Sequence, residues 1–164
     1  MPSEADAIER ERWLSAGSEI TTMLLQGMAE EDVLEHIVSV AREIADADTA
    51  GLVLPGLKGE LVMEIVRGWN ADDLLGLVMP RDGLSWTALR TGRARNITSL
   101  AKARNIAHEE MRKFGPALYA PMGTPETPVG VLVLLRKKTQ EAFIAKDLER
   151  ASTFADQAAL ALVI

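Results

Sequence analysis

Apolar residues recur every three or four positions in two stretches near the start of the chain, which is the spacing of amphipathic helices. Gly27 separates the two stretches and is a typical helix stop. The acidic run at residues 30–32 favours the start of the second helix, because negative charge complements the positive end of a helix dipole. The two stripes are Trp13, Gly17, Ile20 and Leu24, and then Val33, Leu34, Ile37, Val38, Ala41, Ile44 and Ala45.

The hydrophobic period then changes to that of strands. Residues 49–54 and 61–67 predict two strands joined by a turn at residues 55–59, and therefore a β-hairpin. Two later strands are predicted over residues 117–122 and 129–135. Their nearly continuous apolar character indicates burial on both faces of a sheet.

The stretch between these two pairs of strands, residues 71–115, is less regular. Residues 84–91 predict a short helix that ends before Gly92. Residues 93–97 predict a short strand, and residues 103–113 a further short helix that the following Phe-Gly-Pro breaks.

The last segment predicts an amphipathic helix that is still apolar where the chain stops at Ile164. We expect the chain to be cut from a longer protein, because a helix this apolar needs a neighbour along its whole length. We divide the chain into a leading helix at residues 1–28, a linker or dimerisation element, and a domain at residues 29–164 with a truncated last helix. The apolar face of the last helix comprises Ile144, Leu148, Ala151, Phe154, Ala155, Ala158, Ala159 and Leu162.

The order of the predicted elements gives the fold class. It runs helix, helix, hairpin, irregular crossover, two strands and helix. This order indicates an α+β fold, within the broad α/β class, in which N- and C-terminal helices flank an antiparallel sheet.

Composition narrows the functions that this fold could carry. The chain has no cysteine, which removes disulfides, thiolate nucleophiles and Cys-based metal sites. A net charge of −6 argues against nucleic-acid binding, and we interpret the basic run at residues 136–138 as the solvated end of a strand. No apolar run is long enough to span a membrane, and the acidic N-terminus is unlike a secretory leader, so we expect a cytoplasmic protein.

No catalytic constellation is evident in the sequence. Ser85 has no histidine near it in the chain, and we interpret it as a helix-start residue. Asp72 and Asp73 form an adjacent acidic pair whose side chains would point apart, which favours a helix N-cap over acid–base chemistry.

Several ordered segments resemble the GAF domain, a ligand-sensing module of signalling proteins. The segments are residues 82–93, residues 118–122, residues 129–132, and Phe143 with Asp147 four positions later. Trp13-Leu14 and the Ala-Asp-Ala-Asp-Thr-Ala run at residues 45–50 are similar to the tandem GAF modules of actinobacterial sensor histidine kinases that respond to oxygen or redox state. The resemblance implies a regulatory segment that is not itself an enzyme.

The resemblance also implies a small-molecule pocket between one sheet face and the irregular crossover. Its walls are then expected to include two aromatic residues that combine an apolar body with a polar tip. The alternative is that the same residues fill the core of a domain without a ligand. The candidates are Met79, Leu84, Trp86, Ile97, His108, Phe114 and Tyr119.

The resemblance leaves the cofactor unknown, and several family cofactors are disfavoured. Haem is disfavoured because residues 113–116, where haem-binding relatives carry the proximal histidine, contain none. His36 is interpreted as a helix-packing residue, whereas His108 could reach a ligand. Covalent bilin and sulfoxide-reductase chemistry both lack their cysteines, and cyclic nucleotide binding is disfavoured because Arg136-Lys137 replaces the family's Asn-Lys.

Two functions follow from the resemblance. The first is a sensory or relay domain of a two-component sensor histidine kinase, which forms a parallel homodimer through its terminal helices and contacts adjacent domains of the same chain. The alternative is a small-molecule-binding regulatory domain of a transcription activator or a cyclase regulator.

Overall fold

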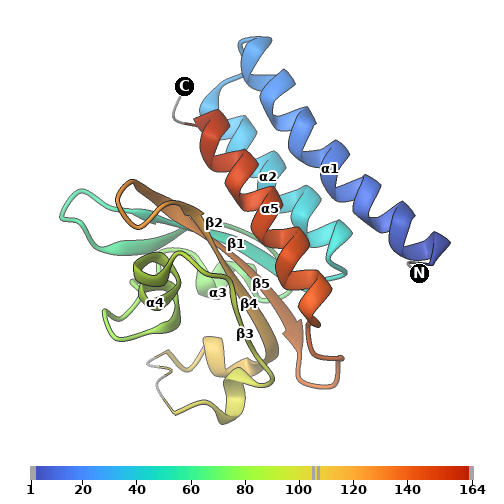
Figure 1. Ribbon diagram of the computed structural model, residues 1–164. Coiled ribbons are helices and arrows are strands. Elements are labelled where there is room, and N and C mark those ends of the chain that lie inside the picture. The colour runs from blue at the N-terminus through green and yellow to red at the C-terminus, as the bar shows by residue number, and fades with distance from the viewer. Residues whose placement is uncertain (1–2, 105, 107, 163–164) are drawn as a thin grey trace.

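The computed structural model describes residues 3–104, 106 and 108–162. Five antiparallel strands form one sheet in the order β2-β1-β5-β4-β3. Helices that include the first and the last of the chain cover one face of this sheet (Figure 1), which confirms the predicted α+β class. The strands are β1 (Thr49–Pro55), β2 (Leu61–Gly68), β3 (Arg95–Ile97), β4 (Phe114–Gly123) and β5 (Pro128–Lys137).

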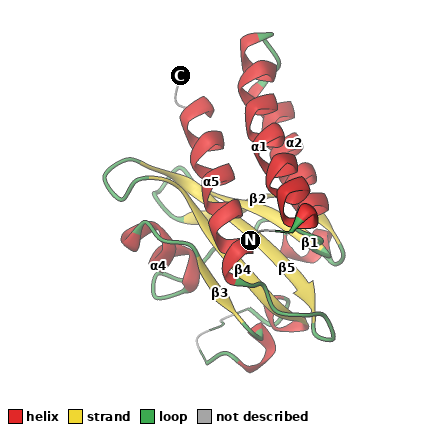
Figure 2. Ribbon diagram, turned by 45° about the vertical axis from the view of Figure 1, so that its right-hand side comes forward, coloured by secondary structure: helices red, strands yellow, loops and turns green. Residues whose placement is uncertain are grey.

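Three long helices form the layer on one face of the sheet (Figure 2). They are α1 (Glu4–Leu25), α2 (Glu30–Ile44) and α5 (Ala145–Leu162). The helix α1 packs against both α2 and α5, and the predicted stripes of α1 and α2 face the core. The buried side of α5 is rich in alanine, which lets the helix approach the sheet closely.

The opposite face carries the irregular crossover between β2 and β4. It contains two short helices, α3 (Ala71–Leu74) and α4 (Leu84–Thr91), and two single-turn 3₁₀ helices, η1 (Leu100–Lys102) and η2 (Met111–Lys113). Gly92 ends α4 in the left-handed conformation, with φ of 68°, as the sequence predicted.

The two central strands β4 and β5 are buried on both faces, as predicted. In β4, Leu118, Ala120 and Met122 join the core beneath the long helices, whereas Ala117 and Tyr119 join a second core beneath the crossover. Alternation along a strand therefore divides one apolar segment between two separate cores. We call these sides of the sheet the helix face and the crossover face.

Part of the crossover differs from its sequence-based prediction. The helix predicted over residues 103–113 is wrong: the described part of this stretch is loop, and the 3₁₀ turn η2 occupies its end (residues 105 and 107 lie outside the described residues). The side chain of Arg112 replaces helical hydrogen bonds, because it donates to the carbonyls of Ala103 and Ile106.

Two smaller predictions are also wrong. The N-cap of α3 is Asn70, not Asp72 or Asp73, which lie in the first turn. Ile144 is 59% exposed and precedes α5, because its N–H donates to the Asp147 carboxylate, 2.8 Å away, and turns the chain outward. By contrast, the basic run at residues 136–138 ends β5 in solvent as predicted: Lys137 and Lys138 are exposed, and Arg136 is half-buried.

Among the described residues, no helix combines the length and the hydropathy that a membrane crossing requires.

Candidate functional site

A small cavity lies on the crossover face, between β4, the start of α4 and the loop that precedes η2. Its volume is about 30 Å³, near that of a single water molecule. Four of the predicted pocket residues line it: Met79, Leu84, His108 and Tyr119. The structure thus brings four of the seven candidates together, around a cavity far smaller than a typical ligand pocket.

The wall of this cavity contains a polar group that sequence reasoning had set aside. Ser85 is 2% exposed, and its Oγ has no hydrogen-bond partner among the described residues. A buried hydroxyl without a partner is destabilising, so this oxygen is available to a water or a ligand. Its burial depends on the tertiary position of α4, which no local sequence signal could have revealed.

Tyr119 and His108 supply two further polar groups. Burial raises the pKa of the Tyr119 hydroxyl far above its usual value, so the phenol is neutral at physiological pH. The Nε2 atom of His108 lies 2.7 Å from the carbonyl oxygen of Val78 and links the loop to the segment before α4. The wall of the cavity thus combines a neutral phenol with an imidazole that is held by a backbone carbonyl.

The other three predicted pocket residues lie elsewhere on the crossover face. Phe114 is fully buried and packs edge-to-face on Trp69, with ring centroids 5.1 Å apart. Trp86 lies beneath the guanidinium of Arg81, 4.8 Å from its ring centroid. Ile97 packs against the second core without reaching the cavity.

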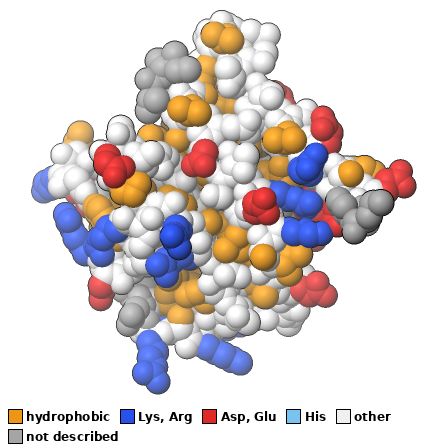
Figure 3. All heavy atoms as spheres, in the orientation of Figure 1, with side chains coloured by type: hydrophobic (Ala, Val, Ile, Leu, Met, Phe, Trp, Pro, Cys, Tyr) orange, Lys and Arg blue, Asp and Glu red, His pale blue; other side chains and the backbone are white. Residues whose placement is uncertain are grey.

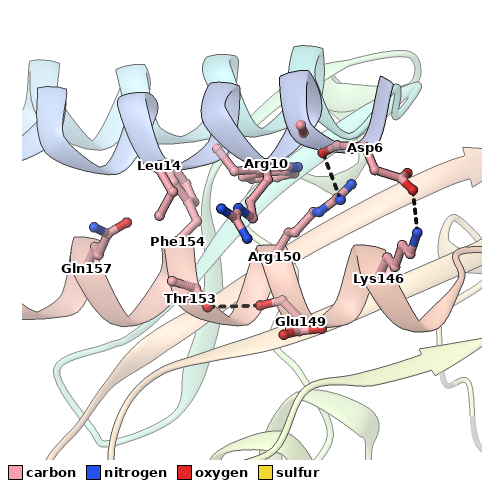
Figure 4. Close-up of a pocket in the computed structure, with 11 residues that line it drawn as sticks. Asp6, Arg10, Leu14, Lys146, Glu149, Arg150, Thr153, Phe154 and Gln157 are labelled. Carbon is pink, nitrogen blue, oxygen red and sulfur yellow. Dashed lines mark hydrogen bonds and ion pairs between the residues drawn. The ribbon is translucent and has the colours of Figure 1, made fainter. Parts of the chain in front are cut away.

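A second and larger depression lies on the helix face, between α1 and α5 (Figure 4). We call it the helix groove; its volume is about 340 Å³. Charged side chains from both helices surround an apolar floor that contains Trp13 and Phe154, whose ring centroids are 5.4 Å apart. The groove is lined by Asp6, Ala7, Arg10, Trp13, Leu14, Lys146, Glu149, Arg150, Thr153, Phe154 and Gln157.

The sequence profile of the GAF domain matches residues 27–163, which is most of the chain. This chain belongs to the GAF domain family. The match begins after α1, so the helix groove pairs a helix of the GAF domain with a helix outside the matched region.

Solved structures of other GAF proteins are similar to this chain. The GAF-B domain of DevS from Mycobacterium smegmatis is 28% identical, with a TM-score of 0.68, over 80% of this chain and 90% of that one. The GAF domain of a phosphoenolpyruvate-protein phosphotransferase from Coxiella burnetii is 19% identical, with a TM-score of 0.76, over 94% of each chain.

An enzyme also has this fold. Free methionine-R-sulfoxide reductase from Neisseria meningitidis is 16% identical, with a TM-score of 0.77, over 99% of this chain and 93% of that one. At this low identity, as for the phosphotransferase domain, the likeness shows the fold alone.

The GAF signature residues near the end of the chain have structural contacts. Phe143 is 2% exposed and lies beneath the guanidinium of Arg136, 4.0 Å from its ring centroid. The Asp147 carboxylate accepts a hydrogen bond from the N–H of Ile144 and so closes the first turn of α5. These contacts give both residues a role in holding the fold.

Haem does not fit the crossover cavity of this GAF domain as it stands. The cavity is far too small for a porphyrin, and the Nε2 atom of His108 is already hydrogen-bonded to Val78. His36 lies on the opposite face of the sheet, on α2, with its Nε2 atom 3.6 Å from the Glu19 carboxylate of α1.

Proposed function

We propose that this GAF domain is a sensory or relay domain of a two-component sensor histidine kinase. It transmits the state of a ligand or of a neighbouring domain through α1 and α5. Its likeness to the GAF-B domain of DevS, an actinobacterial sensor kinase, supports this assignment, as do the sequence motifs that resemble such kinases.

The observation that carries the proposal is the parallel packing of α1 on α5. Contacts follow one another in the same direction along both helices: Lys146 pairs with Asp6, Arg150 with Glu9, and Phe154 with Trp13. A change at one helix therefore displaces the other along their shared interface. Such an interface suits signal transmission, because a packed helix pair can shift between discrete arrangements.

Arg136 connects the sheet to the segments that flank α2 and α5. From the end of β5, its guanidinium donates to the carbonyls of Ala45 and Asp46 after α2, and to that of Glu141 before α5. The distances are 2.6 Å, 3.1 Å and 3.0 Å respectively. One side chain thus links the sheet to α2 and α5 on the helix face. A signal that starts on the crossover face could reach these helices through this link.

The coding sequence around this segment tests the assignment directly. A phosphoacceptor-histidine helix and an ATP-binding domain after residue 164 would support it. An AAA+ or helix-turn-helix domain there would contradict it and would support the alternative below.

Within such a kinase, Arg136→Ala tests the relay. We expect the autophosphorylation rate of the full-length protein to change, because the sheet is no longer tied to α2 and α5. Lys138→Ala is the matched control, since Lys138 is an exposed neighbour in the same basic run. Equal rates for the two folded variants would contradict a relay through Arg136.

The proposal extends to a parallel homodimer through the terminal helices. Large apolar side chains remain exposed on them: Ile8 is 57%, Leu25 81% and Leu160 67% exposed. Sedimentation equilibrium tests this. We expect a dimer that Ile8→Glu weakens, and a strict monomer at high concentration would contradict it.

The second candidate is a small-molecule-binding regulatory GAF domain of a transcription activator or a cyclase regulator. The buried, unpartnered Ser85 hydroxyl in the crossover cavity favours it, because that group lacks a partner only until something binds.

A further inference from the structure

We propose that the helix groove between α1 and α5 binds a small organic carboxylate, with the anionic group on Arg10 and the apolar body on the floor of the groove. The site goes beyond the sensory function proposed above and does not depend on it. The groove lies on the helix face and is therefore separate from the crossover cavity. One of its two walls, α1, precedes the region that the GAF family profile matches.

The charges of the groove are unequally paired. Among its basic residues, Lys146 is held by the Asp6 carboxylate at 2.6 Å, and Arg150 by the Glu9 carboxylate at 3.1 Å. Arg10 has no acidic partner among the described residues. Figure 4 shows its side chain between the two helices, whereas Glu149 points away from α1. Arg10 and Glu149 are therefore the two charged lining residues without an ion pair among the described residues, and only Arg10 lies where an anion in the groove could reach it.

Arg150, beside Arg10 in the groove, is held in a fixed position. Its side chain is only 12% exposed, and its second guanidinium nitrogen donates to the backbone carbonyl of Asp6, 3.1 Å away. The Lys146 hydrogen bond lowers the pKa of Asp6, so this carboxylate stays ionised beside Lys146 to a lower pH than a free aspartate would. Both basic neighbours are therefore fixed in place and leave Arg10 free to bind.

The floor of the groove indicates an apolar body for the ligand. It contains the aromatic pair of Trp13 and Phe154, and Leu14, which is 40% exposed, stands at its edge. A volume of about 340 Å³ is within the range of small-molecule sites. Figure 3 shows basic side chains beside hydrophobic ones where α1 and α5 lie together. A carboxylate with an aliphatic or aromatic body matches both features.

Two buried polar atoms in the wall also lack partners among the described residues. They are Nε1 of Trp13, a donor in a side chain that is 3% exposed, and Oε1 of Gln157, an acceptor. Gln157 packs so closely over α1 that a Cβ at Gly17 would lie 1.8 Å from its oxygen. Both atoms lie beneath the surface of the groove, so they mark an imperfectly satisfied helix contact at its floor and not a direct ligand contact.

Hexanoate is the probe for this site, and Trp13 is the reporter. Replacing Trp69 and Trp86 by phenylalanine leaves Trp13 as the only tryptophan of the chain. We expect hexanoate to change the Trp13 emission in a saturable way. Hexanol and inorganic phosphate should each bind at least about tenfold more weakly, because each satisfies only half of the site.

Arg10→Gln should weaken hexanoate binding about tenfold or more, since it removes the charge-assisted hydrogen bonds. Arg12→Gln is the matched control, because it removes the same charge from the same helix outside the groove. Leu14→Asp is an independent variant at an exposed position, and it should abolish binding by repelling the carboxylate. Circular dichroism checks that each variant is folded.

Three results would overturn the proposal. The first is an Arg10→Gln variant that binds hexanoate as well as Arg12→Gln does. The second is equal binding of phosphate and hexanoate, which would indicate a surface that attracts any anion. The third is a Trp13 signal that changes with protein concentration and not with hexanoate, which would show that a second copy of the chain fills the groove.

Discussion

The two faces of the sheet share the same strands but are covered by different kinds of element. The helix face is closed by long helices whose alanine-rich and aromatic side chains fill the space, as in the contact between Trp13 and Phe154. The crossover face is closed by short helices and loops and retains a cavity beside Ser85. The long helices bury a large apolar core and leave an open groove between α1 and α5, whereas the crossover encloses a small cavity beside a buried polar group.

The largest effect is expected on the helix face. Phe154→Ala should lower the free energy of unfolding by about 3–5 kcal/mol, because it leaves a cavity in a densely packed core. Urea unfolding followed by circular dichroism measures this loss. Leu160→Ala on the same helix is the control: Leu160 is 67% exposed, and its loss should be within about 0.5 kcal/mol. Equal losses would mean that α5 is not anchored by its aromatic contact.

An intermediate effect is expected at alkaline pH on the crossover face. The pKa of Tyr119 is raised in the folded state, so its burial contributes stability that is fully present below about pH 10. That contribution is lost above pH 10 by about 1.4 kcal/mol per pH unit, as the unfolded phenol ionises. Tyr119→Phe should remove this part of the alkaline destabilisation.

Tyr119 is the only tyrosine of the chain, which makes the measurement specific. Phenolate absorbance should stay absent from the folded protein at pH values where free tyrosine ionises, and should appear together with unfolding. Ordinary titration of the folded protein would show that the cavity wall admits solvent and that the crossover face is open.

The smallest effect is expected at Ser85. Ser85→Ala should not lower the free energy of unfolding, because the hydroxyl forms no hydrogen bond that could be lost and its removal relieves the cost of burying an unpartnered polar group. Thr49→Val is the matched control. Thr49 is equally buried, but its hydroxyl donates to the carbonyl of Trp69, and the loss should be about 1–3 kcal/mol. A similar loss for both would indicate that Ser85 has a partner in solution.

The helix face and the central strands could be read from the sequence, because periodicity records burial directly. The stripe of Val33 to Ile44 and the apolar run of β5 were predicted at nearly their observed bounds. Ile144 was the exception, since its outward turn depends on a hydrogen bond to Asp147 that spacing does not reveal.

The crossover could be predicted only in part. Residues 103–113 look helical, but Arg112 fixes the loop through carbonyls that lie several residues away along the chain. The orphaned hydroxyl of Ser85 and the free charge of Arg10 are likewise properties of tertiary placement. A local sequence pattern can point to a polar or charged residue. Only the folded structure shows whether that residue has a hydrogen-bond or ion-pair partner.

The strand order has a consequence for how the chain is made. The pairing of β1 with β5 at the centre of the sheet joins Thr49 to Leu135, and α1 finds its partner α5 only at the far end of the sequence. During synthesis the first half of the domain therefore cannot complete its sheet until β5 has been made. Until then, the edge of β1 that pairs with β5 is exposed. Contacts so distant in sequence predict slow folding and a dependence on chaperones while the chain is incomplete.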